Sequence, residues 1–256
     1  MADISEGSDG SQIPDPIPFR QQCCSAEVVE SCYNVLNLEA PAVVLAPQEL
    51  IDFVQLNSST VHDHNHHNHD HNHHNHHNHH NNVCHPATLQ ESLDYIKEHG
   101  ISQEKNYPYV GGRKPFVINI HDRPTRNKVK IGGFVSLNNG ETINSRVACH
   151  PIAAFMYLTN EFVKRNEAGI YKVTSDDSVI MCTNRLSGGP LTHAVLVVGF
   201  GKDQDSDDIY WIIKNSFGED WGDKGFRKIC RRSRFLGKPL LFNAVYPFDL
   251  VMHENV

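Results

Sequence analysis

Apolar residues recur at helical spacing in the first well-patterned segment of the chain, residues 25–36. The positions that form this stripe are Ala26, Val29, Cys32, Tyr33 and Leu36. Separations of three and four residues place them on one face of an α-helix. We therefore predict an amphipathic helix that buries this face in a core.

Two further helices are indicated by their ends as well as by their apolar stripes. In residues 46–52, Pro47 stands in the first turn, where a missing backbone N–H costs nothing. Residues 88–100 carry leucine and isoleucine on one face, and Gly100 stands where the helix should end. The first half of the chain is thus predicted to be helical.

The second half of the chain is patterned for strands. Short apolar runs bounded by turn residues are typical of strands that lie in a core. They cover residues 128–137, 152–157, 170–173, 194–200, 209–213, 225–230 and 240–246. Because the strands follow the helices rather than alternate with them, we predict an α+β fold.

Two polar segments stand outside this pattern. Residues 1–19 are polar and contain three prolines, so we predict a loose, disordered leader. Residues 61–82 are almost entirely His, Asn and Asp, with twelve histidines between His62 and His80. This composition buries too little apolar area to offset its ordering entropy, which predicts a disordered surface loop. Weak capture of divalent metal is chemically open to it, but its irregular spacing favours an inert tract.

Composition and charge exclude several classes of protein. A chain of 256 residues with 39% hydrophobic residues is long enough for one large domain or two modest lobes. The formal net charge of −7 argues against binding to nucleic acid or to an anionic membrane surface. No run approaches the roughly 18 apolar residues of a membrane span, and residues 1–10 lack the apolar stretch of a signal peptide. As written, the chain is expected in the cytosol or nucleus.

The chain has seven cysteines, an odd number that leaves at least one unpaired. They are Cys23, Cys24, Cys32, Cys84, Cys149, Cys182 and Cys230. A reducing compartment would keep all of them as thiols. We predict mostly free thiols.

One imidazole and one carboxamide give the clearest chemical signal. His193 heads the predicted strand 194–200, and Asn215 follows the predicted strand 209–213. If these strands are neighbours, the two side chains meet, and an Asn oxygen that accepts from an imidazole N–H fixes the orientation of the ring. A ring held in this way is the base that a cysteine nucleophile requires. The alternative is a structural histidine in a core strand.

The residues around this pair resemble the His–Asn half of the papain-like cysteine peptidases. Gly218, Trp221, Gly222 and Gly225 stand at the family's offsets, and the resemblance extends over about residues 21–247. It identifies the chain as a divergent, plant-type member with a degraded nucleophile segment.

The resemblance implies the papain-like two-lobed fold. Residues 20–120 would form the helical N-terminal lobe, and residues 121–256 a β-rich, barrel-like lobe that carries the His–Asn pair. A peptide or protein would bind in the cleft between the lobes, and we expect a monomer with no cofactor. Family members are usually lysosomal, vacuolar or extracellular, in contrast to the location expected from the start of this chain.

The nucleophile end matches the family less well. The resemblance assigns the nucleophile to Cys24 and the oxyanion-hole amide to Gln22. Cys24 precedes His193 by 169 residues, or by 147 without the tract, a spacing found in the papain group. Alignment of the helix without gaps instead places Arg20 at the thiol's position, as if about one helical turn were missing.

Other family features are altered. The resemblance implies a disulfide bridge near the nucleophile, of which Cys23 and Cys84 would be the remnant. Phe53 stands at one position where the family has cysteine, and Leu240 stands near another. Phe217 replaces the tryptophan that covers the Asn–His hydrogen bond. After Cys84, His85-Pro86-Ala87 replaces the run that ends in two glycines, which removes a backbone donor and crowds an approaching peptide.

By resemblance, an active enzyme would hydrolyse peptide bonds through a thioester. Cys24 would attack the carbonyl, and His193, oriented by Asn215, would take and return the proton. Gln22 and the Cys24 backbone N–H would stabilise the oxyanion. A nucleophile displaced by a helical turn predicts reduced or lost activity, because misplacement by about 1 Å already costs about a hundredfold.

Two other functions stay open at this point. A catalytically dead relative would bind peptides or proteins in the old cleft. A protein of another class would bind metal through the histidine-rich tract, residues 61–82.

Overall fold

The structure, a computed structural model, describes most of the chain outside its polar segments. The described residues are 20–59, 87–115, 120–137, 140–164, 169–174, 177–178, 180 and 190–255. The predicted leader and the histidine-rich tract lie outside these residues, as do Cys84, Pro86 and Cys182. Predictions made for them stay predictions.

Three helices form the helical side of the molecule: α1 (Arg20–Leu36), α2 (Pro47–Ser59) and α3 (Leu89–His99). All three occupy segments whose patterns predicted helices, although α1 begins five residues earlier than expected. A capping box starts α3, because the Thr88 hydroxyl accepts from the Glu91 backbone N–H and the Glu91 carboxylate accepts from the Thr88 N–H. Gly100 ends the helix with a φ of 70°, where a side chain would be strained.

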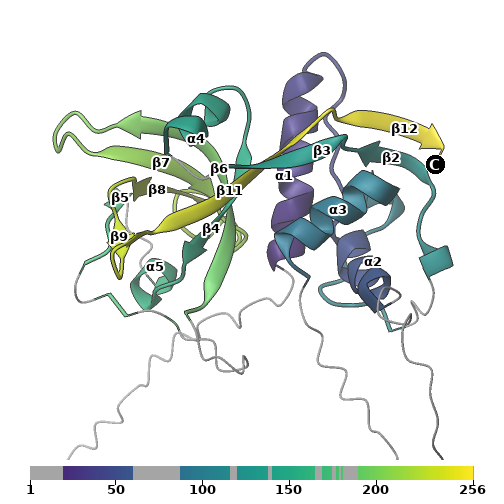
Figure 1. Cartoon of the computed structure of the whole chain (residues 1–256), viewed down its shortest axis with the longest axis horizontal. Coiled ribbons are helices and arrows are strands. Elements are labelled where there is room, and N and C mark those ends of the chain that lie inside the picture. The colour runs from purple at the N-terminus through teal and green to yellow at the C-terminus, as the bar shows by residue number, and fades with distance from the viewer. Residues whose placement is uncertain are drawn as a thin grey trace, which may run out of the picture.

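Most strands of the second half form one seven-stranded sheet (Figure 1). Its order is β3 (Gly133–Leu137), β11 (Leu241–Phe248), β4 (Ile152–Tyr157), β6 (Thr192–Lys202), β7 (Ile209–Lys214), β8 (Phe226–Cys230) and β5 (Ile170–Tyr171). Neighbours are antiparallel except β5 and β8, which are parallel. Two short helices that the pattern did not predict, α4 (Gly140–Val147) and α5 (Asn160–Lys164), connect strands of this sheet.

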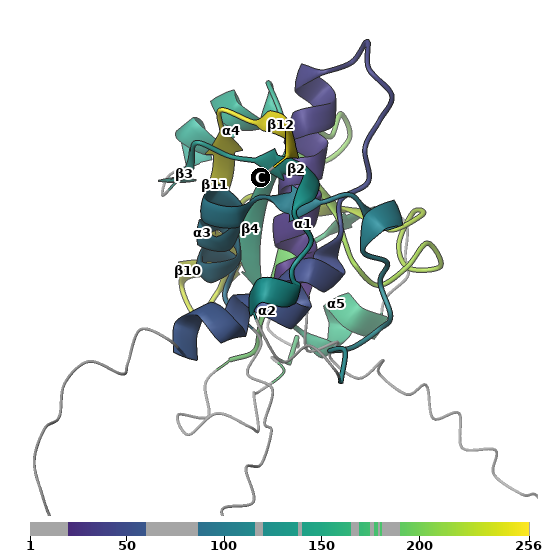
Figure 2. The ribbon, with the colours of Figure 1, turned by 90° about the vertical axis from the view of Figure 1, so that its right-hand side faces the viewer.

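A smaller sheet joins distant parts of the chain beside α3. Its order is β1 (Ile101–Ser102), β2 (Arg126–Lys130) and β12 (Val251–Asn255). Figure 1 shows the chain leaving the large sheet after β11 and forming β12 on the helical side, and Figure 2 places β12 against β2 from a second direction. The predicted strand 128–137 is therefore two strands, β2 and β3, which belong to different sheets. A short hairpin, β9 (Arg234–Phe235) with β10 (Lys238–Pro239), completes the strands of the described residues.

Helix α1 lies between two cores. It packs against α2 and α3 on one side and against β4, β6 and β11 on the other (Figure 1). The helical core includes the fully buried Val29, Leu93 and Ile96. The core of the large sheet includes the fully buried Met156 and Phe162. The predicted apolar face of this helix is thus buried as far as Cys32, whereas Leu36 at its end is 63% exposed.

A fully buried carboxylate, Glu49, ties α2 to the small sheet. Its Oε1 accepts from Lys128 Nζ (2.5 Å) and from the Tyr95 hydroxyl (2.9 Å). Its Oε2 accepts from the Ser102 backbone N–H (2.8 Å). Lys128, 1% exposed, also donates to the His99 carbonyl (3.1 Å). Both charges are therefore enclosed and hydrogen-bonded, the condition under which a buried ion pair is tolerated.

Two further polar side chains of α2 hold the segment that follows η1 (Glu104–Asn106). Gln48 donates to the Gly112 carbonyl (2.7 Å) and accepts from the Val110 N–H (3.0 Å). Asp52 accepts from the Tyr107 hydroxyl (2.8 Å). The polar residues of this helix thus position a loop, which explains why they are buried.

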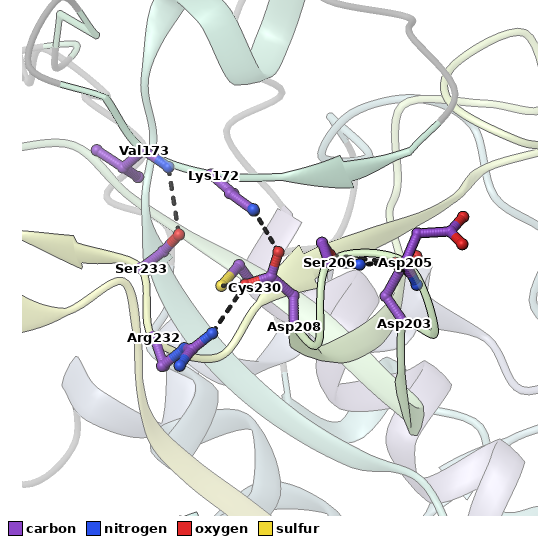
Figure 3. Close-up of polar contacts among 9 residues, drawn as sticks. All are labelled: Lys172, Val173, Asp203, Asp205, Ser206, Asp208, Cys230, Arg232 and Ser233. Atoms are coloured by element: carbon purple, nitrogen blue, oxygen red, sulfur yellow. Dashed lines mark hydrogen bonds and ion pairs between the residues drawn. The ribbon is translucent and has the colours of Figure 1, made fainter.

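Asp208 plays a similar part on the side of the large sheet (Figure 3). It is 5% exposed and pairs with Lys172, next to β5, and with Arg232 Nη2 (3.0 Å), next to β8. The hydrogen bond from Lys172 is the main cause that holds the pKa of Asp208 well below its usual range. In the adjoining turn, Asp203 accepts from the backbone N–H groups of Asp205 and Ser206. The cluster therefore fastens three strand ends.

Candidate active site

The strand order of the large sheet brings His193 and Asn215 together. His193 is the second residue of β6 and stands opposite Met156 of β4. Asn215 directly follows β7, the other neighbour of β6. The Asn215 backbone N–H donates to the Gly225 carbonyl (2.8 Å), which fixes the chain where the strand ends. The two side chains therefore meet as the sequence predicted.

A hydrogen bond of 2.7 Å joins His193 Nε2 and Asn215 Oδ1. The same oxygen accepts from the Ser216 backbone N–H (2.8 Å), which identifies it as the carbonyl oxygen of the amide. His193 Nε2 must therefore donate, and Nδ1 is the proton acceptor of the neutral ring. This is the tautomer that a general base needs.

Aromatic rings cover this pair. The Phe217 ring lies 5.0 Å from the His193 ring between centroids, at an interplanar angle of 32°. Trp221 packs edge-on against Phe217 at 5.4 Å. His193 is 2% exposed and Asn215 is 5% exposed. The hydrogen bond is thus shielded from water, with phenylalanine in the covering position.

The predicted nucleophile lies inside α1 rather than at its beginning. The helix starts at Arg20, so Cys24 is one turn further along, and it is 3% exposed in the helical core. Burial raises the pKa of the Cys24 thiol well above its usual value, and the nearby Glu27 carboxylate raises it further. A reactive cysteine requires the opposite shift. Gln22, in the first turn, is 1% exposed.

A pocket of about 620 Å³ lies between α1 and the chain that follows β7. Cys23 lines it, together with Asn215 and Ser216, whereas Cys24 and His193 do not. The structure therefore places the two neighbouring cysteines of α1 differently, with Cys23 at the pocket and Cys24 in the core.

Carboxylates at this pocket were missed by the reasoning from sequence. Glu27 and Glu30 of α1 line it, and Lys214 Nζ, from the end of β7, is 3.2 Å from Glu27 Oε1. Burial raises the pKa of both carboxyls. The signal was present, since Cys23, Ala26, Glu27 and Glu30 recur at helical spacing and form one face.

Neither a metal centre nor a membrane span is found in the part of the chain that the structure describes. No three His, Cys, Asp or Glu side chains among those residues are grouped to hold a metal ion. None of the helices described is long and apolar enough to cross a bilayer. Cys24, Cys32, Cys149 and Cys230 carry free thiols. The expected Cys23–Cys84 pair involves a residue outside the described segments.

Comparison with known proteins gives a consistent family. The family model described as papain family cysteine protease matches residues 23–238. Curated relatives include a cysteine proteinase of Theileria annulata, 35% identical over 147 residues, which are 57% of this chain and 29% of that protein. Cathepsin L1 of Drosophila melanogaster is 33% identical over 158 residues, 59% of this chain and 38% of that protein. The chain thus spans well under half the length of these relatives.

Solved structures confirm the fold. The bromelain protease from Ananas comosus, in complex with the E64 inhibitor, aligns with a TM-score of 0.63 at 18% identity, over 91% of this chain and 90% of that one. The cysteine protease CMS1MS2 of Carica candamarcensis, in complex with E-64, aligns with a TM-score of 0.60 at 21% identity, over 90% and 87%. The prediction of an α+β fold of this type is confirmed.

Proposed function

Because the chain belongs to the papain family of cysteine proteases, we propose that it is a peptidase homologue whose thiol-dependent turnover is strongly reduced or lost. The observation that carries this proposal is the position of Cys24. The thiol is enclosed in the helical core, and its surroundings raise its pKa. A nucleophilic cysteine has to be both ionised and accessible.

The helix start strengthens this argument. The favourable field of a helix N-terminus acts over the first turn, and Cys24 is the fifth residue of α1. One turn of α-helix also corresponds to about 5 Å along its axis. Since a misplacement of about 1 Å costs about a hundredfold in rate, a shift of this size is sufficient to abolish turnover.

The His193–Asn215 pair supports the ancestry of a peptidase without requiring activity. Both groups are buried, so loss of either one removes a buried hydrogen bond, at a cost of about 1–3 kcal/mol. Selection for stability alone would therefore retain the pair after the nucleophile had moved. In the proposed protein, His193 is an inherited base that has a structural role.

Thiol labelling tests this proposal directly. We expect an epoxide thiol-protease inhibitor of the E-64 type to leave Cys24 unmodified at pH 7, as measured by peptide mapping with mass spectrometry. Iodoacetamide should modify the exposed Cys149 at least about a hundredfold faster than Cys24, because a buried thiol with a raised pKa is rarely ionised.

The matched control is His193→Ala. In the proposed protein it changes neither labelling rate, because Cys24 does not depend on this base. Stoichiometric labelling of Cys24 by the epoxide that disappears in His193→Ala would establish an active enzyme and overturn the proposal. Cys24→Ala should leave hydrolysis of a fluorogenic peptide at the level of the unmutated protein.

A further inference from the structure

We propose that the pocket beside α1 binds the basic side chain of a peptide, whose cationic group lies among the carboxylates of Glu27, Glu30 and Glu104. This site is independent of whether Cys24 reacts. The cavity of about 620 Å³ is in the size range of ligand pockets, roughly 300–1,000 Å³.

The pocket wall has more negative than positive charge. Three half-buried carboxylates face one ammonium group, Lys214, which among the described residues lies within ion-pair distance of Glu27 only. At the rim, the exposed Glu219 and Lys224 offset each other. Glu30 accepts a neutral backbone N–H, from Leu45 at 2.8 Å. A ligand with one or two positive charges would balance the excess negative charge of this wall.

Glu104 shows the same deficit at the level of single atoms. Its Oε1 accepts from the Tyr109 backbone N–H (2.6 Å), whereas its buried Oε2 has no hydrogen-bond partner among the described residues. The Tyr109 ring, 41% exposed, stands at the same pocket. A guanidinium or ammonium group could pair with the carboxylate and lie against the ring face.

Asn215 and Ser216 provide an independent indication of a ligand. Asn215 is 5% exposed, and its Nδ2 has no acceptor within the part of the chain that the structure describes. Ser216 Oγ likewise has no partner there. Both residues line the pocket on the wall opposite α1. Because buried donors without acceptors are rare, a ligand carbonyl is a suitable partner for them.

A peptide satisfies both walls at once. Its basic side chain would meet the carboxylates, its backbone carbonyl would accept from Asn215 or Ser216, and its apolar atoms would contact Val44 and Phe226. A bare metal ion fits less well, since no grouping of ligating side chains is found among the described residues. The chain's own residues 1–19 contain four carboxylates and no Lys or Arg, so their charge disfavours them as the occupant.

The first test needs no variant. The full chain is titrated with acetyl-Gly-Arg-Gly-amide, and the dissociation constant is measured by NMR chemical-shift changes. The same peptide with citrulline, which has nearly the same shape and no charge, should bind at least about tenfold more weakly. A third peptide, with glutamate in place of the arginine, should not bind. Equal affinity for the Arg and citrulline peptides, or no binding of the Arg peptide, would overturn the proposal.

A pair of variants locates the site. Glu104→Gln keeps an acceptor for the Tyr109 N–H and removes one charge, so the Arg peptide should bind about tenfold more weakly. Glu98→Gln, on the exposed face of α3, makes the same charge change away from the pocket and should leave affinity unchanged. Thermal unfolding verifies that both variants fold. Equal affinities of the two variants would place the peptide elsewhere and refute the assignment.

Discussion

Two glutamates of the helical side, Glu49 and Glu104, have opposite surroundings. Glu49 is fully buried, and both of its oxygens accept hydrogen bonds, one of them from the enclosed Lys128. Glu104 is only partly buried, and one of its oxygens has no partner among the described residues. The first carboxylate is complete within the fold, whereas the second faces a pocket that is short of positive charge.

The difference indicates which charges serve the fold and which are available to a ligand. A buried ion pair that is hydrogen-bonded on all sides gains nothing from a further partner, and losing one member is costly. A carboxylate that lines a cavity and keeps an unused acceptor can bind a cation without losing existing contacts. Burial alone would have suggested the opposite, with the fully buried Glu49 as the functional carboxylate rather than the partly buried Glu104.

The largest expected effect on stability comes from breaking the buried ion pair between Glu49 and Lys128. Lys128→Met should lower the free energy of unfolding by about 3–5 kcal/mol, because it leaves the Glu49 carboxylate buried without its cation. Urea unfolding followed by circular dichroism measures this change. Lys130→Met, on the same strand, is the control and should cost no more than about 0.5 kcal/mol. Equal losses would show that the pair is not the source of the effect.

A second prediction concerns pH and the satisfied carboxylate of the large sheet. Because the pKa of Asp208 is lowered, its pairing with Lys172 and Arg232 stabilises the fold above the ordinary pKa of about 4 and is lost as the pH falls below it. Asp208→Asn should therefore be less stable than the unmutated protein at pH 7, and this difference in stability should become smaller towards pH 3.

Urea midpoints measured between pH 3 and 7 test the role of Asp208. Asp94→Asn, on the exposed face of α3, should show no such narrowing. A gap of constant size for Asp208→Asn would contradict the assignment of its charge to the fold.

The smallest effect is expected at the pocket, and with the opposite sign. Burial raises the pKa of Glu30, so its ionised form is disfavoured in the folded protein, and stability is lost as the pH rises through that pKa. Glu30→Gln keeps an acceptor for the Leu45 N–H and should be equally or more stable at pH 7, by less than about 1 kcal/mol.

The gain in stability of Glu30→Gln should vanish below about pH 4, where Glu30 of the unmutated protein is protonated in both the folded and the unfolded state. Glu39→Gln, an exposed neighbour, is its control in the same urea series. A clear loss of stability at pH 7 in Glu30→Gln alone would show that this charge serves the fold as Glu49 does.

Much of the fold could be predicted from the sequence because its elements carry local signals. The predicted helix 88–100 corresponds closely to α3, since its cap at Thr88 and its end at Gly100 are chemical features of single residues. The predicted strand 152–157 matches β4 because its apolar run has clear limits. By contrast, β12 is defined by pairing with β2, more than a hundred residues away, and its own pattern is short.

The candidate site could be predicted only where geometry follows from strand order. His193 and Asn215 lie on neighbouring strands, so their contact follows from the topology. The start of α1 was missed because Gln22 and Ser25 are polar yet fully buried, which conceals the continuation of the apolar face. The burial of Cys24 depends on that start. Glu27 and Glu30 share one face of α1, but Glu104 comes from η1, so no single segment reveals the whole pocket.

The crossing of β12 has a consequence for the inheritance of this protein. Its two halves are interleaved, since the helical side receives a strand from the far end of the sequence. If the gene were split, or one lobe were exchanged with that of a relative, β2 would lose its pairing with β12. The strand edge left open would promote aggregation. Changes can therefore accumulate inside either half, but the halves must evolve together as one indivisible unit.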